Sequence, residues 1–97
     1  MKTPQQCENL LDIRAAIDDL DRTIVESIAL RARYVKEAAR FKKDEGGVKD
    51  PDRVAAVIAS KMALAEECGV SAELIGSLYK IMIEYFVNEE LREWKTK

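Results

Sequence analysis

The chain has 97 residues, of which 47% are hydrophobic and 35% are charged, and its formal net charge is −2. A chain of this size is expected to form one domain, over residues 1–97, and its composition excludes both a disordered protein and a membrane-spanning one. Because no basic face dominates a slightly acidic chain, binding to nucleic acid or to anionic membranes is not expected. Any cationic site must therefore be local.

The residue types present narrow the chemistry further. The sequence contains no histidine, no glycine-rich phosphate loop and no G-x-S-x-G nucleophile motif. The two cysteines, Cys7 and Cys68, are far apart and lack metal-ligand spacing, so we expect reduced structural thiols. The polar N-terminus has no apolar stretch typical of a secretory signal, which predicts a cytoplasmic protein. Any catalysis then falls to Arg, Lys and carboxylate groups.

A long first helix is predicted over residues 10–43, which contain neither Gly nor Pro. Apolar residues recur there at helical spacing: Ile13, Ile17, Leu20, Ile24, Ile28, Val35 and Ala38. Such a helix is about 50 Å long, whereas a compact domain of this length is about 30 Å across. One subunit cannot cover this apolar stripe, so we expect an interlocked homodimer with paired long helices.

Two shorter helices are expected to complete an all-α fold of three helices. Gly46 and Gly47 predict a loop over residues 44–49, and Asp50 followed by Pro51 is typical of a helix start, here of a helix over residues 51–67. Gly69 and Ser71 are then a typical stop and N-cap, and they predict a third helix that ends near residue 95. A short N-terminal turn is predicted at residues 3–4.

Several charged residues lie where the helical pattern predicts apolar ones. Arg31 follows Ile24 by seven positions, and Lys42 lies within about 20° of the same face of a continuous helix. Glu90 follows Phe86 by four positions on the stripe of the third helix. We therefore expect these three side chains to point inward.

Two further arginines extend the set of candidate site residues. Arg14 precedes Arg31 by 17 positions, about 25 Å along one helix, so we expect it to reach a pocket of the partner subunit. Arg53, in the first turn of the second helix, is expected beside the loop at residues 44–49. Each charge alone is typical of an interhelical ion pair, such as one between Arg31 and Glu90. Several buried cations in a small core together favour an anionic ligand.

The sequence resembles the all-helical chorismate mutases over almost its whole length, and within them the isochorismate pyruvate lyases of salicylate and siderophore synthesis. The segments that carry this resemblance are residues 1–4, 12–14, 18–21, 34–36, 40–42, 51–56 and 89–94. The resemblance implies a small dicarboxylate substrate, a pericyclic reaction and no cofactor or metal.

The resemblance also implies roles for single residues. Arg14 of one subunit and Arg31 of the other would grip the two substrate carboxylates, and Lys42 would face the ether oxygen that joins the ring to the enolpyruvyl group. Glu90 would be a second partner of that oxygen. The loop at residues 44–49 would be a lid, and the apolar wall would come from Val35, Val48 and Val87.

Two positions depart from the common pattern of the family. Val54 stands where most relatives have a Glu that holds the ring hydroxyl of chorismate, which favours the lyase branch. Glu90 stands where the lyases typically have Gln and some mutases have Glu. A chorismate mutase of aromatic amino-acid synthesis is therefore the main alternative. A non-catalytic regulatory or interaction dimer is the alternative of another class, and it is expected to have lost at least one of Arg14, Arg31 and Lys42.

Overall fold

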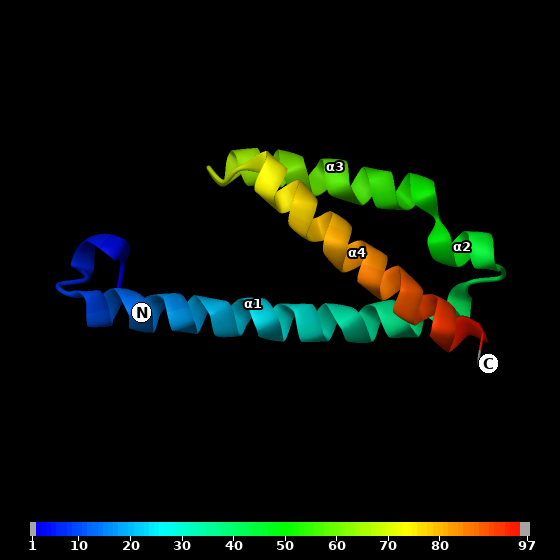
Figure 1. Ribbon diagram of the computed structural model, residues 1–97, viewed down its shortest axis with the longest axis horizontal. Helices are drawn as coiled ribbons and strands as arrows, with labels where there is room; N and C mark the ends of the chain where they lie inside the picture. The colour runs from blue at the N-terminus through cyan, green and yellow to red at the C-terminus, as the bar shows by residue number, and fades with distance from the viewer. Residues whose placement is uncertain (1, 96–97) are drawn as a thin grey trace. The chain divides into compact units, whose positions relative to one another are not determined.

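The structure is a computed structural model that describes residues 2–95. Its elements in chain order are η1 (Pro4–Gln6), α1 (Leu10–Ala38), η2 (Ala39–Phe41), α2 (Glu45–Lys49), α3 (Pro51–Glu67) and α4 (Ala72–Lys95) (Figure 1). The η elements are single turns of 3-10 helix. No strand occurs in the described part of the chain. The predicted all-α fold with a long first helix is confirmed.

The chain divides into two compact units, of which the first ends at Arg33 and the second begins at Tyr34. The first unit contains η1 and most of α1. Asn9 caps α1 because its Oδ1 accepts a hydrogen bond from the Asp12 backbone N–H at 2.8 Å. The Asp12 carboxylate in turn accepts from the Glu8 N–H at 3.1 Å and lies 2.9 Å from the Lys2 ammonium. The predicted N-terminal turn is thus present and is tied to the start of α1.

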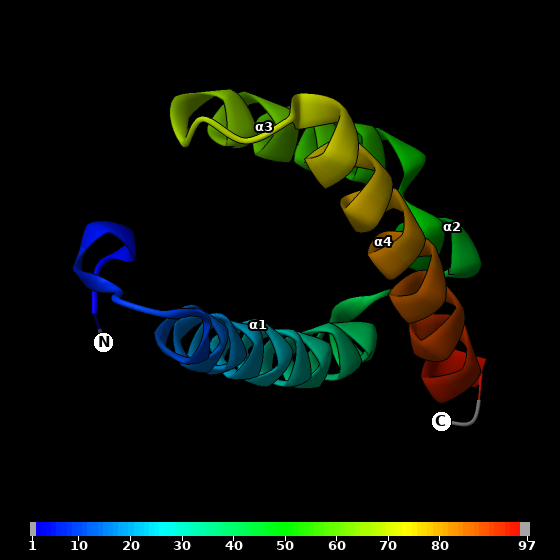
Figure 2. The ribbon, with the colours of Figure 1, turned by 60° about the vertical axis from the view of Figure 1, so that its left-hand side comes forward.

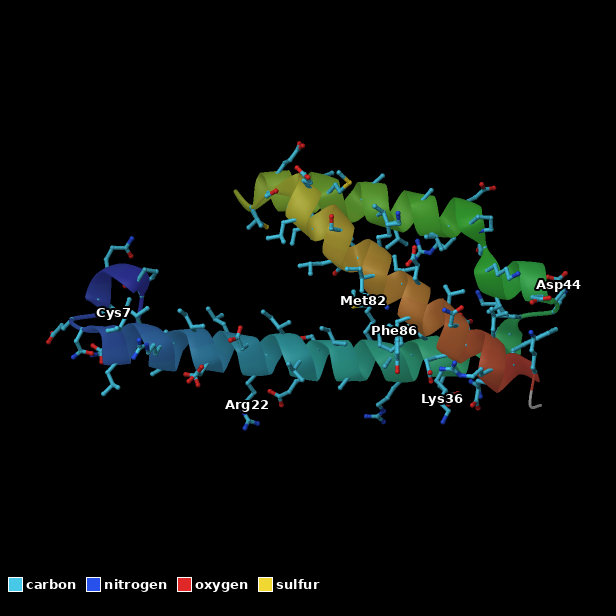
Figure 3. All side chains as sticks on the ribbon, in the orientation of Figure 1. Cys7, Arg22, Lys36, Asp44, Met82 and Phe86 are labelled. Carbon is cyan, nitrogen blue, oxygen red and sulfur yellow. The ribbon has the colours of Figure 1, made fainter. Side chains whose placement is uncertain are left out.

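α1 has 29 residues and a length of about 43 Å, and none of its residues is buried. Its apolar stripe is open: Ile17, Leu20 and Ile24 are each about half exposed, and Ile28 is 38% exposed. Side chains project from the helix, as that of Arg22 does in Figure 3. The apolar stripe predicted from the sequence is therefore more exposed than the buried face of a core helix.

The segment after α1 differs from the sequence prediction at two points. The α-helix ends at Ala38, not near residue 43, because Ala39–Phe41 tighten into a 3-10 turn and the backbone of Lys42 is extended. The predicted loop at residues 44–49 contains the helix α2, whose N-cap is Asp44 (Figure 3). The Asp44 Oδ1 accepts from the Gly47 N–H at 2.7 Å, and Val48 is buried. A cap and a buried side chain thus outweigh two glycines.

α3 and α4 begin and end as predicted, and the chain runs toward their connection along α3 and away from it along α4 (Figure 2). Asp50, with φ of +32°, is both the C-cap of α2 and the N-cap of α3. Its Oδ1 accepts a hydrogen bond from the Arg53 N–H at 3.2 Å. Gly69 has φ of +73°, a conformation that costs glycine little, and the Ser71 hydroxyl caps α4 through the Leu74 N–H at 3.1 Å.

The core of the second unit is small. Its buried apolar residues are Ala39, Val48, Ala65 and Ile83. Gly76 of α4 lies against Met62 of α3, so closely that an added Cβ would come within 2.9 Å of the sulfur. No helix in residues 2–95 is long and apolar enough to cross a bilayer, and both cysteines are free thiols.

Candidate functional site

Lys42 occupies a defined position in the second unit. Its ammonium Nζ donates a hydrogen bond to the Gly47 backbone carbonyl at 3.1 Å, and it lies 3.9 Å from the Glu90 Oε1. The side chain is about one-quarter exposed. The helical phase that placed Lys42 on the face of Arg31 is wrong, because α-helical geometry ends at Ala38. The Lys42 side chain nevertheless points inward, toward Glu90.

Glu90 is the buried charged residue of the described chain, with 6% of its surface exposed. Its Oε1 accepts no hydrogen bond from residues 2–95. Burial raises the pKa of the Glu90 carboxyl, and the positive charge of Lys42 opposes this shift without cancelling it. The sequence did not show whether burial or the charge of Lys42 has the larger effect on this pKa. In the structure the larger effect is that of burial. The carboxyl therefore keeps its proton to a higher pH than an exposed glutamate does, and in the protonated form it can donate a hydrogen bond.

Trp94 is a member of this cluster that the sequence analysis missed. Its indole Nε1 donates a hydrogen bond to the backbone carbonyl of Lys42 at 3.2 Å. Trp94 lies eight residues after Phe86 on the apolar face of the third predicted helix, and such a pattern says nothing about a partner for the indole N–H. The one available signal was its spacing of four residues after Glu90, which puts both side chains on the same face of the helix.

Arg14 and Arg31 both lie on α1 in the first unit. Arg14 is exposed and Arg31 is half-buried. Because α1 is continuous between them, the two residues are about 25 Å apart along the helix axis. Their side chains therefore cannot reach one small pocket from a single copy of α1.

The remaining predicted residues lie in the second unit. Val35 is half-buried in the last turn of α1, and Arg53 is exposed in the first turn of α3. Val54 is half-buried and lines an open groove of about 560 Å³ between α3 and α4, together with Ile83 and Val87. The side of α3 that carries Val54 thus presents an apolar wall with no carboxylate on it at this position.

The arrangement supplies one cation and one protonatable acid at a partly enclosed site, and no nucleophile lies among these residues. In residues 2–95 no group of three or more His, Cys, Asp or Glu side chains is placed to hold a metal ion. Such a site is suited to stabilising negative charge on a substrate oxygen, and it is unsuited to covalent catalysis.

Comparisons with known proteins agree over most of the chain. Residues 13–91 match the family model described as chorismate mutase type II. The chain is 40% identical over 95 residues to an isochorismate pyruvate lyase of Pseudomonas aeruginosa. The matched region covers 98% of this chain and 94% of that protein.

Two longer relatives are also similar. The T-protein of Haemophilus influenzae is 34% identical over 92% of the chain, and the T-protein of Enterobacter agglomerans is 32% identical over 90% of it. The matched part is 24% of each T-protein, so this chain spans about a quarter of their length. A family match over residues 13–91, together with a relative matched end to end, leads to one conclusion: the chain belongs to the chorismate mutase type II family.

Proposed function

We propose that this protein is an isochorismate pyruvate lyase that splits isochorismate into salicylate and pyruvate, with a weaker conversion of chorismate to prephenate. The observation that carries the proposal is the Lys42–Glu90 pair, a cation beside a buried acid of raised pKa. The name of the Pseudomonas relative, which matches from end to end, supports the lyase reaction in particular.

The reaction needs no nucleophile and no external base. A hydrogen moves from the hydroxyl-bearing ring carbon to the methylene carbon of the enolpyruvyl group while the bond between ring and ether oxygen breaks. The ring becomes aromatic salicylate, and the departing fragment is pyruvate. Negative charge builds on the ether oxygen during this step, and a positioned cation and a hydrogen-bond donor lower the barrier.

The proposed roles follow this chemistry. Lys42 faces the ether oxygen, and the protonated Glu90 carboxyl donates a second hydrogen bond to it. Arg31 and the partner subunit's Arg14 bind the two substrate carboxylates. Arg53 lies beside the substrate entrance, and Val35 contributes to the apolar wall.

The homodimer is part of this proposal. Its support is the open apolar stripe of α1, whose members are between 38% and 55% exposed from Ile17 to Ile28. A second copy of the helix is suited to cover such a stripe. The separation of Arg14 from Arg31 along α1 is the second support, because two carboxylates of one small molecule cannot span about 25 Å.

The test is a comparison of the two substrates with the purified protein. Salicylate fluorescence from isochorismate, with a slower loss of chorismate absorbance, is the expected result. Efficient turnover of chorismate without any salicylate from isochorismate would make the chain a mutase. No turnover of either substrate would favour a non-catalytic helical dimer.

We expect Val54→Glu to shift the preference toward chorismate. A carboxylate at this position offers an acceptor to the chorismate ring hydroxyl, and a hydrogen bond of this kind typically changes a substrate preference by about tenfold to a hundredfold. The measurement is the ratio of kcat/KM for the two substrates. Val54→Leu is the matched control, because it keeps the wall apolar and should leave the ratio within about threefold of wild type. An equal shift in both variants would contradict the assignment.

The raised pKa of Glu90 predicts a pH dependence. If the protonated carboxyl is the active form, kcat/KM rises as pH falls through this pKa, and Glu90→Gln makes the profile flat in that range because the amide donates at every pH. The free energy of unfolding should also fall as pH rises through this pKa, because a group that binds its proton more tightly in the folded state opposes folding once it is ionised. Glu90→Gln is thus expected to melt at pH 7 at a temperature no lower than that of the wild type. An unchanged profile in this variant would show that another group titrates.

A further inference from the structure

The backbone at Lys42 is not held by regular secondary structure. The residue follows the last turn of η2 and is extended, with φ of −88° and ψ of 135°. Its N–H donates to the Ala39 carbonyl at 3.2 Å, which is the last hydrogen bond of that turn. The Lys42 carbonyl lies past the end of η2 and depends on a partner from another element.

That partner is the indole of Trp94, 52 residues further along the chain. The Nε1–H donates to the Lys42 carbonyl at 3.2 Å, and Trp94 is half-buried near the C-terminal end of α4. A tryptophan offers one donor and no acceptor, so this hydrogen bond uses its whole polar capacity. The indole therefore ties the end of α4 to the residue that carries the ammonium.

Both ends of Lys42 are contacted from the same face of α4. Glu90 and Trp94 are one helical turn apart, and the first lies 3.9 Å from Nζ while the second binds the main chain. Gly47 of α2 supplies the third contact through its carbonyl. The Trp94 side chain thus holds the Lys42 backbone, and Glu90 and the Gly47 carbonyl restrict the position of the ammonium.

We propose that Trp94 is a positioning residue, whose hydrogen bond to the Lys42 carbonyl sets the origin of the lysine side chain and so aims its ammonium at the reacting oxygen. This inference rests on the proposed function for its effect on rate. A lysine has four rotatable side-chain bonds, so a displaced backbone at its root spreads the ammonium over many places. Catalysis by a point charge is sensitive to such displacements.

The first measurement uses no substrate. Because the chain has a single Trp, its indole proton gives one resolved NMR signal, and we expect that proton to exchange with solvent at least about tenfold more slowly than that of a free indole. Exchange at the rate of a free indole would overturn the proposal, because the hydrogen bond would then not persist in solution.

The second measurement is made on Trp94→Phe, which keeps an aromatic ring and removes the donor. We expect kcat to fall about tenfold while KM stays within about twofold, since the lost interaction orients a group and does not bind substrate. Tyr85→Phe is the matched control: it also removes one polar group from an aromatic side chain of α4, it is 59% exposed, and it should leave both constants unchanged. A loss shared equally by the two variants, or a rise of KM alone, would overturn the positioning role.

The third measurement separates this inference from the proposed function. The positive charge of Lys42 lowers the pKa of Glu90, so a lysine that is no longer held near the carboxyl should let that pKa rise further in Trp94→Phe, and not in Tyr85→Phe. Carboxyl-carbon NMR of Glu90 reports this shift in a protein with no substrate. If the wild type lacked activity on both substrates, the proposed function would fail while this titration still decided whether Trp94 positions Lys42. An unshifted Glu90 in Trp94→Phe overturns the proposal.

Discussion

Replacement of Lys42 by methionine should lower kcat/KM for isochorismate by about a hundredfold to a thousandfold, the range found when one group that stabilises a developing oxyanion is removed. Methionine is unbranched and of similar length, so it fills the space of the lysine stem and takes away the charge. The effect should fall on kcat, because the charge on the ether oxygen exists only in the transition state. Steady-state kinetics with salicylate detection provides the measurement.

Lys43→Met provides the control for this variant, because Lys43 is the next residue and is exposed. It should retain wild-type kinetics. The fold of Lys42→Met is expected to survive, since the Glu90 carboxyl already has a raised pKa and can take up a proton when its cationic neighbour is gone. A loss of less than about tenfold in a folded Lys42→Met protein would remove Lys42 from the proposed mechanism.

Mixing two inactive variants should restore activity if the site is shared between subunits. We expect Arg14→Ala and Lys42→Met each to be inactive as homodimers. Random pairing after refolding together gives half heterodimers, and each of these holds one intact site, so about a quarter of the wild-type activity should return. Sedimentation should give about twice the chain mass of 11.0 kDa.

A second mixture gives the control for this experiment. In the proposed site, Arg31 and Lys42 come from the same subunit, so mixing Arg31→Ala with Lys42→Met creates no intact site and should restore nothing. Equal recovery in both mixtures would contradict the sharing of Arg14. A folded monomer at micromolar concentration would contradict the dimer itself.

The sequence allowed the bounds of α3 and α4 to be predicted because strong local signals mark them. A helix start is marked by Asp50 with Pro51 and by Ser71, and the side chains of Asp50 and Ser71 accept hydrogen bonds from backbone N–H groups in the first turns of α3 and α4. A helix end is marked by Gly69. The end of α1 was missed because no breaker marks the tightening of Ala39–Phe41 into a 3-10 turn. α2 was missed for the opposite reason: its two glycines are typical of a loop, and burial of Val48 is a tertiary effect.

The candidate site was predicted to a similar degree. Lys42 and Glu90 were identified as charges at positions that an apolar pattern reserves, and the structure pairs them. The helical phase predicted for Lys42 required an unbroken helix to residue 43 and was wrong, because α1 ends at Ala38. Trp94 was not identified, because periodicity shows which face a residue occupies and cannot show that an indole N–H meets a carbonyl 52 positions away.

The junction at Asp50 has a consequence for which changes of chain length the protein tolerates. A single residue with φ of +32° ends α2 and begins α3, so the two helices share a cap and have no spare residue between them. One inserted residue would turn α3 by about 100° relative to α2 and carry Val54 out of its groove. A substitution of an exposed residue at this junction leaves the register of α3 relative to α2 unchanged. Insertions and deletions between Lys49 and Pro51 should therefore be much rarer among functional variants than substitutions there.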